Sequence, residues 1–493
     1  MKSKIIAFFF SLIILSIIFY SGCTYDKPLN LAGRGYPTNI ANIIVRKCAV
    51  AGCHNTQSAP GAAGLDLTTW QSLFKGGNNG SSVVPYRPDF SYMMYFINTY
   101  HDLGPSLIPT MPYSNNPLSH DEVSTIKNWI AQGAPNSDGF VMWSDNPDRK
   151  KFYVLNQGCK ICSVFDQQTK LVMRVVDVGD SANILPHEVH VSPDNKYWYV
   201  IFASGNIVEK FDASTDQMIA KIPIMGDGNA RAWNSSSITP DGTHDFIIDW
   251  ENNGLVAYVD LENLNTPFVY QGAGLFTYPH GSTLNNNGNT LYITGLSGNF
   301  YYKMDVTDPI NNPQLPQTIS LNGQPPNPTS SLNSYDVKFT PDGSRYFISC
   351  LGTGEVRMLQ TSNDSLLKVF SVGAYASELG ISDSHPYLFV SCQEDTTTYP
   401  GKRGSVYIIN YNTNTVIGSV FTGWQPHGLD IDDAAQLVYV TNRNVNTSGP
   451  APHHTTVCGR DGYVTIIDLN TLQLLPGFNI EVSSDPFDVS LRQ

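Results

Sequence analysis

The segment Cys48-Ala49-Val50-Ala51-Gly52-Cys53-His54 brings two thiols and an imidazole close together in the chain. Covalent attachment of haem needs two thiols, which form thioether bonds with its vinyl groups, and a neighbouring imidazole nitrogen for the iron. The spacing here is C-x4-C-H, longer than the common C-x2-C-H. Two other interpretations stay open: a disulfide between Cys48 and Cys53, or half of a zinc site. Zinc would need four closed ligands, and no second cluster of cysteine or histidine lies nearby in the sequence.

A second axial ligand for such an iron is expected downstream. Met111 lies in a proline-rich loop between Pro109 and Pro112. Prolines stiffen a loop that must hold a weak thioether ligand, and methionine opposite histidine raises the reduction potential. Met93 and Met94 are competing candidates. They belong to an apolar run, so core packing is their expected role.

Helices are expected on both sides of these residues. Apolar residues at helical spacing from Ile40 to Val45 lead directly to Cys48, so a helix is predicted to present the cysteines. Beyond Met111, Ser119 and Glu122 have the spacing of a capping box, which predicts the start of another helix.

Residues 40–136 resemble a class of small bacterial c-type cytochrome domains that are often fused to other modules. The matching motifs, after the haem motif itself, are Gly64-Leu65-Asp66-Leu67, Gly76-Gly77, Val84-Pro85, Met111-Pro112 and Trp129-Ile130-Ala131-Gln132-Gly133-Ala134. The resemblance implies a small all-α domain over residues 38–137 that carries one covalent haem c. Cys48 and Cys53 would form the thioethers, and His54 and Met111 would be the axial ligands.

The N-terminus has the features of a signal for export. Lys2 and Lys4 precede an apolar run from Ile5 to Tyr20, which is short for a membrane-spanning helix of about 20 residues. Nothing later in the sequence is apolar enough to cross a membrane.

The run ends in Tyr20-Ser21-Gly22-Cys23, which resembles the lipobox of bacterial lipoproteins, although leucine is usual where Tyr20 stands. The resemblance implies a signal peptide over residues 1–22, a lipid-modified Cys23 and a tether over residues 23–37. The protein would then be exported and anchored to a membrane, facing the periplasm or the cell surface. The alternative is an ordinary secretory signal with Cys23 as an incidental thiol.

Five further cysteines fall outside the haem motif and the N-terminal signal. Cys159 and Cys162 form a C-x-x-C without a following histidine, so a haem is not expected there. A local disulfide, or a bridge that involves Cys458, fits an oxidising compartment. Cys350 and Cys392 stand at equivalent points of two repeats and are expected to be small buried residues.

The region from residue 151 to 493 is repetitive. Seven strand-like segments recur at intervals of 42–55 residues, beginning at Phe152, Trp198, Phe246, Leu291, Tyr346, Leu388 and Val438. Further strand-like segments and Pro-Asp or Asp-Gly turns follow them, so four short strands per repeat predict an all-β seven-bladed propeller after a linker at residues 138–150. The segment Tyr439-Val440-Thr441-Asn442 resembles the propeller-repeat family named after that tetrapeptide. The final strand, Phe487 to Leu491, is expected to complete the first blade.

Alignment of the innermost strands places seven residues in equivalent positions at one mouth of the central channel: His187, Asn234, His280, Tyr335, Ser377, His427 and Phe487. Pro-His pairs are frequent there in this repeat family, which favours a structural role in satisfying loop backbone groups. The functional interpretation is an imidazole cluster that binds a metal, a second cofactor or an anionic substrate. His190, His453 and His454 could add to such a site.

Composition limits the function. Only 14% of the residues are charged, and the net charge of −13 argues against binding of nucleic acid.

The leading hypothesis is electron transfer, with the propeller as a docking platform for a redox partner protein. The second is an oxidoreductase whose propeller holds another metal or cofactor; the haem c and haem d nitrite reductases and nitrous-oxide reductase resemble it in architecture only. The third is a binding scaffold without catalysis.

Overall fold

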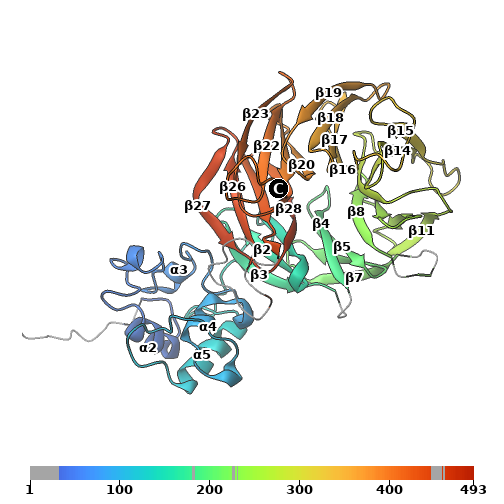
Figure 1. Cartoon of the computed structure of the whole chain (residues 1–493). Coiled ribbons are helices and arrows are strands. Elements are labelled where there is room, and N and C mark those ends of the chain that lie inside the picture. Colours follow the sequence, from blue (N-terminus) through green and yellow to red (C-terminus); the bar gives the residue numbers. More distant parts are fainter. Residues whose placement is uncertain are drawn as a thin grey trace, which may run out of the picture.

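The computed structural model describes residues 31, 33–179, 184–224, 228–229, 231–445, 458 and 461–493. They form a small helical unit followed by a ring of β-sheets (Figure 1). The predicted fold class, a helical domain followed by a seven-bladed propeller, is confirmed. Cys23, His453 and His454 lie outside the described residues, as does the predicted signal peptide. Within the described ranges, no helix has the length and apolar character needed to cross a bilayer.

The helical unit is built from short elements around a shared core. Its α-helices are α2 (Thr38–Lys47), α3 (Trp70–Leu73), α4 (Tyr92–Ile97) and α5 (His120–Ala131), and its 3₁₀ turns are η1 (Ala59–Gly61), η2 (Pro88–Phe90) and η3 (His101–Leu103). Helix α2 buries Ile40 and Ile44, and α5 buries Ile126 and Ile130, because apolar residues recur at helical spacing in both. The capping box at Ser119 is formed, since Glu122 Oε2 accepts a hydrogen bond from Ser119 N at 2.9 Å.

The described strands form seven four-stranded antiparallel sheets. Listed from the innermost strand outwards, the blades are β28 (Pro486–Arg492), β1 (Lys151–Asn156), β2 (Ile161–Asp166), β3 (Leu171–Asp177); β4 (Leu185–Val191), β5 (Tyr197–Ser204), β6 (Ile207–Asp212), β7 (Met218–Pro223); β8 (Trp233–Ile238), β9 (His244–Asp249), β10 (Val256–Asp260), β11 (Asn265–Tyr270); β12 (Pro279–Leu284), β13 (Thr290–Gly295), β14 (Phe300–Asp305), β15 (Gln317–Ser320); β16 (Ser334–Phe339), β17 (Arg345–Cys350), β18 (Glu355–Gln360), β19 (Leu366–Ser371); β20 (Ala376–Ile381), β21 (Tyr387–Cys392), β22 (Ser405–Asn410), β23 (Thr415–Val420); and β24 (Pro426–Asp432), β25 (Leu437–Asn442), β26 (Tyr463–Asp468), β27 (Gln473–Glu481).

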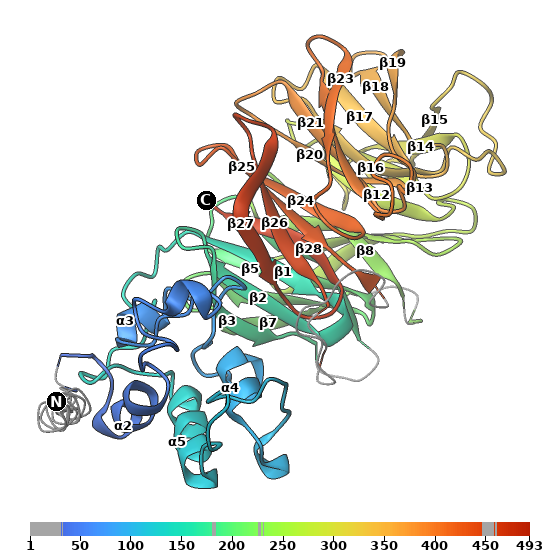
Figure 2. The ribbon, with the colours of Figure 1, turned by 60° about the vertical axis from the view of Figure 1, so that its left-hand side comes forward.

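The last strand of the chain closes the ring. Strand β28 pairs with β1, with Val489 opposite Val154 and Leu491 opposite Phe152. Figure 2 shows the two strands side by side although they come from opposite ends of the propeller sequence. The innermost edge of the first blade is therefore covered by the C-terminus, as the unpaired final strand predicted.

The helical unit packs directly on the first and last blades, beside β3 and β27 (Figures 1 and 2). Ser81 Oγ donates to Val172 O at 2.9 Å, and Arg87 Nη1 donates to Val175 O at 3.0 Å. The segment at 138–150, predicted as a linker, is also packed: Trp143 is buried, and its ring contacts that of Phe74. The two units thus share apolar surface in addition to their covalent connection.

Candidate functional sites

A tight turn after α2 folds the two thiols and the imidazole together. Cys48 follows the last residue of α2, and its amide donates to Ile44 O at 2.9 Å. His54 N then donates to Cys48 O at 3.1 Å, which returns the chain to the end of the helix. Gly52 lies in this turn with φ +83°, a left-handed conformation that favours glycine.

Cys48 and Cys53 are both free thiols. Burial, and then the neighbouring Cys53 thiol, raise the pKa of Cys48 to about 12. Cys48 therefore stays a neutral thiol at physiological pH, half-buried against the apolar core of the unit.

His54 is oriented by a backbone carbonyl. Its Nδ1 lies 3.2 Å from Leu65 O, and Leu67 N donates to His54 O at 2.9 Å. A carbonyl can only accept, so the Nδ1 atom carries the proton and Nε2 keeps its lone pair. That tautomer is the one in which Nε2 can bind a metal. The Gly64-Leu65-Asp66-Leu67 motif thus supplies the partner that holds the ring.

Met111 is held over the same core. Its amide donates to Phe96 O at 2.8 Å, so the proline-rich loop is tied to α4, and its side chain is half-buried against the apolar cluster that also contacts Cys48 and Leu65. Met93 and Met94 are 8% and 4% exposed within α4, the burial expected for core packing. Of the three methionines, Met111 is the one that is only partly buried.

The donor set fits a haem c. The segment offers two thiols and an imidazole whose Nδ1 is held by a carbonyl, and Cys48 and the Met111 thioether border the same apolar core; these are the groups that covalent attachment and axial ligation require. The zinc alternative receives no support, because the described residues contain no group of three or more His, Cys, Asp or Glu arranged to hold a metal ion.

The seven predicted channel positions are equivalent in the structure. Each innermost strand contains a β-bulge that leaves one residue unpaired in three strands and two in the other four. In every strand one of the unpaired residues belongs to a set that we call the channel ring: His187, Asn234, His280, Tyr335, Ser377, His427 and Phe487. A bulge re-aims the side chain of the extra residue. The recurrence of the bulge in every blade therefore explains why these residues gather at the channel.

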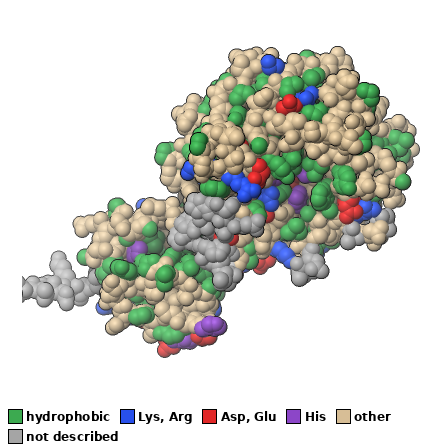
Figure 3. Space-filling model, in the orientation of Figure 1, with side chains coloured by type: hydrophobic (Ala, Val, Ile, Leu, Met, Phe, Trp, Pro, Cys, Tyr) green, Lys and Arg blue, Asp and Glu red, His purple; other side chains and the backbone are tan. Residues whose placement is uncertain are grey.

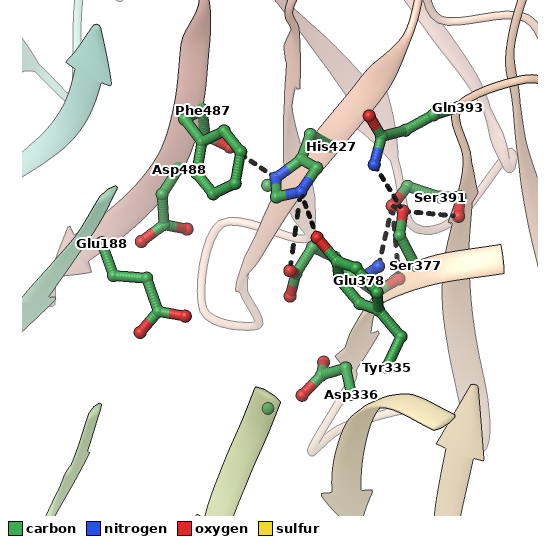
Figure 4. Close-up of polar contacts among 12 residues, drawn as sticks. Glu188, Tyr335, Asp336, Ser377, Glu378, Ser391, Gln393, His427, Phe487 and Asp488 are labelled. Carbon is green, nitrogen blue, oxygen red and sulfur yellow. Dashed lines mark hydrogen bonds and ion pairs between the residues drawn. The ribbon is translucent and has the colours of Figure 1, made fainter. Parts of the chain in front are cut away.

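The three ring histidines are buried and hydrogen-bonded. Gln157 Nε2 donates to His187 Nδ1 at 2.9 Å, His280 Nδ1 lies 3.2 Å from Tyr335 O, and His427 Nδ1 lies 2.8 Å from Phe487 O. Figure 4 shows His427 between Phe487 and Tyr335, and the Tyr335 hydroxyl lies 3.0 Å from His427 Nε2.

Burial lowers the pKa of all three ring histidines, to about 4 for His280 and well below the usual range for His187 and His427. The imidazoles are consequently neutral and bonded to backbone or to neighbouring side chains. His190, outside the ring, has its Nε2 at 2.8 Å from Glu188 Oε2.

A layer of carboxylates next to the channel ring was not anticipated. Glu188, Asp336, Glu378 and Asp488 each follow a ring residue in sequence, and in Figure 4 Glu188, Asp336 and Asp488 point toward a common central space from different blades. The sequence signal was present, since four of the seven ring residues precede an acidic residue.

Most of these carboxylates tie one blade to the next. Asp488 Oδ2 accepts from Val189 N at 2.9 Å, Glu188 Oε2 from Ser236 N at 3.1 Å, and Asp336 Oδ2 from Leu379 N at 3.0 Å. Each bond satisfies a backbone N–H on the innermost strand of the neighbouring blade. Lys338 is influenced by these acids, since Asp336 and then its acidic neighbours raise the pKa of the lysine.

Comparison with known protein families gives one match. Residues 51–104 match the family model described as planctomycete cytochrome C. The matched range contains Cys53, His54 and Leu65, begins after Cys48 and ends before Met111. The helical unit thus contains a cytochrome c domain, which implies haem c. A comparison with curated proteins gave no match.

Among solved structures, hydrazine synthase from Kuenenia stuttgartiensis is 16% identical, with a TM-score of 0.46 over 63% of this chain and 91% of that chain. A functionally unknown protein from Desulfotomaculum acetoxidans DSM 771 is 11% identical, with a TM-score of 0.51 over 69% of this chain and 98% of that chain. At such identities the second similarity concerns the fold alone.

Proposed function

We propose that this protein is an exported electron-transfer protein with one haem c, anchored to a membrane by a lipid on Cys23, whose propeller is a docking platform for a redox partner protein. Cys48 and Cys53 are the attachment points, and His54 and Met111 are the axial ligands of the iron. The family match supports a cytochrome c domain. The ligand roles and the anchor are our own assignments.

The observation that carries the proposal is the orientation of His54. Its Nδ1–H is bound by Leu65 O, while the turn that contains it brings Cys48 and Cys53 together. A hydrogen bond from the other ring nitrogen fixes the tautomer and the ring direction of metal-bound histidines.

Each residue has a defined task in this proposal. His54 and Met111 would bind the iron, and the apolar core around Leu65 and Met111 would exclude water and favour the reduced state. A bound haem would supply a one-electron couple. Ile108 and Tyr113, 88% and 67% exposed on either side of Met111, give the loop an apolar outer surface for a partner. Figure 3 shows hydrophobic side chains gathered on the helical unit.

Haem attachment is tested by removing the thiols. The protein is produced in a host with the cytochrome maturation machinery, and covalent haem is detected by staining denaturing gels and counted per chain by absorbance. The unaltered chain should carry one haem, and the double variant Cys48→Ala/Cys53→Ala should carry none.

Cys350→Ala and Cys392→Ala are matched controls, because both cysteines are buried in propeller blades, and both variants should keep the haem. A chain without covalent haem before any substitution would refute the proposal.

The anchor is tested separately. Cys23→Ser should move the protein from the membrane fraction to the soluble exported fraction, because acyl chains on Cys23 are the one membrane-binding element proposed. Immunoblots of fractionated cells provide the measurement. If the variant and the parent associate equally with membranes, lipidation at Cys23 is not the anchor.

A further inference from the structure

Two cysteines that lie 299 positions apart in sequence contact each other at the closure of the propeller ring. Cys159 ends the 3₁₀ turn η4 (Gln157–Cys159) that follows β1, and Cys458 lies in the connection between β25 and β26. Cys159 Sγ donates to Cys458 O at 2.7 Å, and Cys458 Sγ lies 3.9 Å from Cys159 O. Each sulfur therefore lies against the backbone of the other cysteine.

Both backbones are fixed to the same short segment before β28. The carbonyl of Cys458 accepts from Ser483 Oγ at 2.6 Å and from Ser484 N at 3.3 Å. On the other side, Gly158 N donates to Ser484 O at 3.2 Å. The segment that contains Ser483 and Ser484 thus holds the backbone of both cysteines. Their contact therefore does not depend on side-chain orientation alone.

The other cysteines of the propeller are turned away from this contact. Cys162 is fully buried on β2 in the core that contains Tyr153 and Leu155, whereas Cys159 and Cys458 both border a different core, that of Phe152 and Val154. Cys350 and Cys392 lie in the cores of other blades. The two cysteines of the C-x-x-C segment, Cys159 and Cys162, therefore border different cores, and Cys159 faces Cys458.

We propose that Cys159 and Cys458 form a disulfide that closes the propeller ring. The oxidant is a disulfide of the thiol–disulfide exchange class, for which oxidised glutathione is a simple representative. One protein thiolate attacks it, forms a mixed disulfide and releases one reduced thiol. The second protein thiolate then displaces the other, so two S–H bonds are exchanged for one S–S bond, and both electrons leave in the two released thiols.

The position of the proposed disulfide would let it stabilise the closed ring. It would join the first blade to the last within a few residues of the β28–β1 pairing, next to the surface where Arg87 of the helical unit hydrogen-bonds Asp177. A crosslink between residues so far apart in sequence removes much of the conformational freedom of the unfolded chain. The haem ligands take no part in it, so its failure would leave the proposed function intact.

Peptide mapping tests the bond directly. The purified full chain is incubated with oxidised glutathione, denatured in N-ethylmaleimide without reductant and digested with trypsin. Cleavage after Lys160 separates Cys159, in Phe152–Lys160, from Cys162, in Ile161–Lys170. The first peptide should be recovered joined to Asn444–Arg460, which contains Cys458, while Ile161–Lys170 carries the alkyl label.

Thermal unfolding of the oxidised chain provides a second readout. Reductant should lower the melting temperature of the parent by roughly 5 °C and leave that of Cys159→Ser unchanged. Cys162→Ser is the matched control and should keep both the crosslinked peptide and the response to reductant. Recovery of Cys159 and Cys458 as alkylated thiols after oxidation, or of Cys159 joined to Cys162, would overturn the proposal. The mapping experiment uses the unaltered chain, so it stands even if a variant fails to fold.

Discussion

At the scale of single residues, the side chains that we propose as iron ligands are less buried than those that pack the core of the helical unit. His54 and Met111 are half-buried, and each is tied to the backbone of another segment, at Leu65 and at Phe96. Met93 and Met94 are enclosed on α4. A side chain that is positioned but not enclosed is free to bind a further group, whereas an enclosed one contributes mainly to stability.

Met111→Ala should leave the thioether bonds in place and vacate the distal side of the haem. A thioether favours reduced iron, so the reduction potential should fall, and any methionine-to-iron charge-transfer band in the red part of the oxidised spectrum should disappear. Added imidazole should bind more readily. Optical spectra and redox titration provide the measurements.

Met93→Ala is the control for this substitution, and it should lower the free energy of unfolding by about 2–5 kcal/mol without changing the spectrum. If Met111→Ala leaves spectrum and potential unchanged while Met93→Ala alters them, the ligand is one of the upstream methionines.

At the scale of elements, the innermost strands provide the channel ring, and one of them, β28, closes the propeller. Their bulges set the channel ring, and their acidic residues bond the neighbouring blades, as Asp488 of β28 does with Val189 N on β4. Strand β28 therefore connects with β1 by pairing and with β4 through a carboxylate. We expect the propeller to depend on this strand more than on an outer one, because most residues of β28 are buried between the neighbouring blades, whereas those of an outer strand such as β23 are mostly exposed.

Two valine-to-alanine substitutions test this difference. Val489, in β28, is 4% exposed, while Val416, in the outer strand β23, is 38% exposed. Val489→Ala should lower the free energy of unfolding by about 2 kcal/mol, because it leaves a cavity at the closure. Val416→Ala should change it by less than about 0.5 kcal/mol. Denaturant unfolding followed by circular dichroism compares them, and equal effects would contradict a special role for β28.

At the scale of the whole molecule, the buried carboxyl groups on the innermost strands make stability depend on pH. Burial is the main cause that raises the pKa of Glu188 to about 8, of Asp488 to about 7 and of Asp430 to about 6. The folded protein then holds protons that the unfolded chain has released, since an unperturbed glutamate titrates near 4.5. The stability that these protonated groups contribute is present at low pH and is lost as pH rises.

These carboxyl groups should lower the denaturant midpoint at pH 8 relative to pH 5.5, against an opposite contribution from the three ring histidines, whose pKa is lowered by burial. Glu188→Gln, which keeps an oxygen to accept from Ser236 N, should reduce this difference, because the amide does not ionise. Glu262→Gln, on an exposed turn, is the control and should leave the difference unchanged. Identical pH dependence in the parent and Glu188→Gln would show that Glu188 is not the group responsible.

The sequence by itself determined the repeated architecture and the candidate haem residues. Cys48, Cys53 and His54 are contiguous, the capping box at Ser119 spans four residues, and the strands recur with a period that leaves the last one unpaired. Each of these signals is local or periodic, so it can be recognised before any three-dimensional arrangement is known.

Tertiary structure alone decided which distant residues meet. The carbonyl that orients His54, the convergence of Glu188, Asp336 and Asp488, and the contact of Cys159 with Cys458 all join segments from separate parts of the chain. No local pattern pairs them. His54 meets Leu65 O through the folding of the helical unit, whereas the carboxylates and the two cysteines meet because the ring closes and bulges re-aim residues of the innermost strands. The sequence determines which side chains each strand has, while the closure of the ring determines which side chains of different strands face one another.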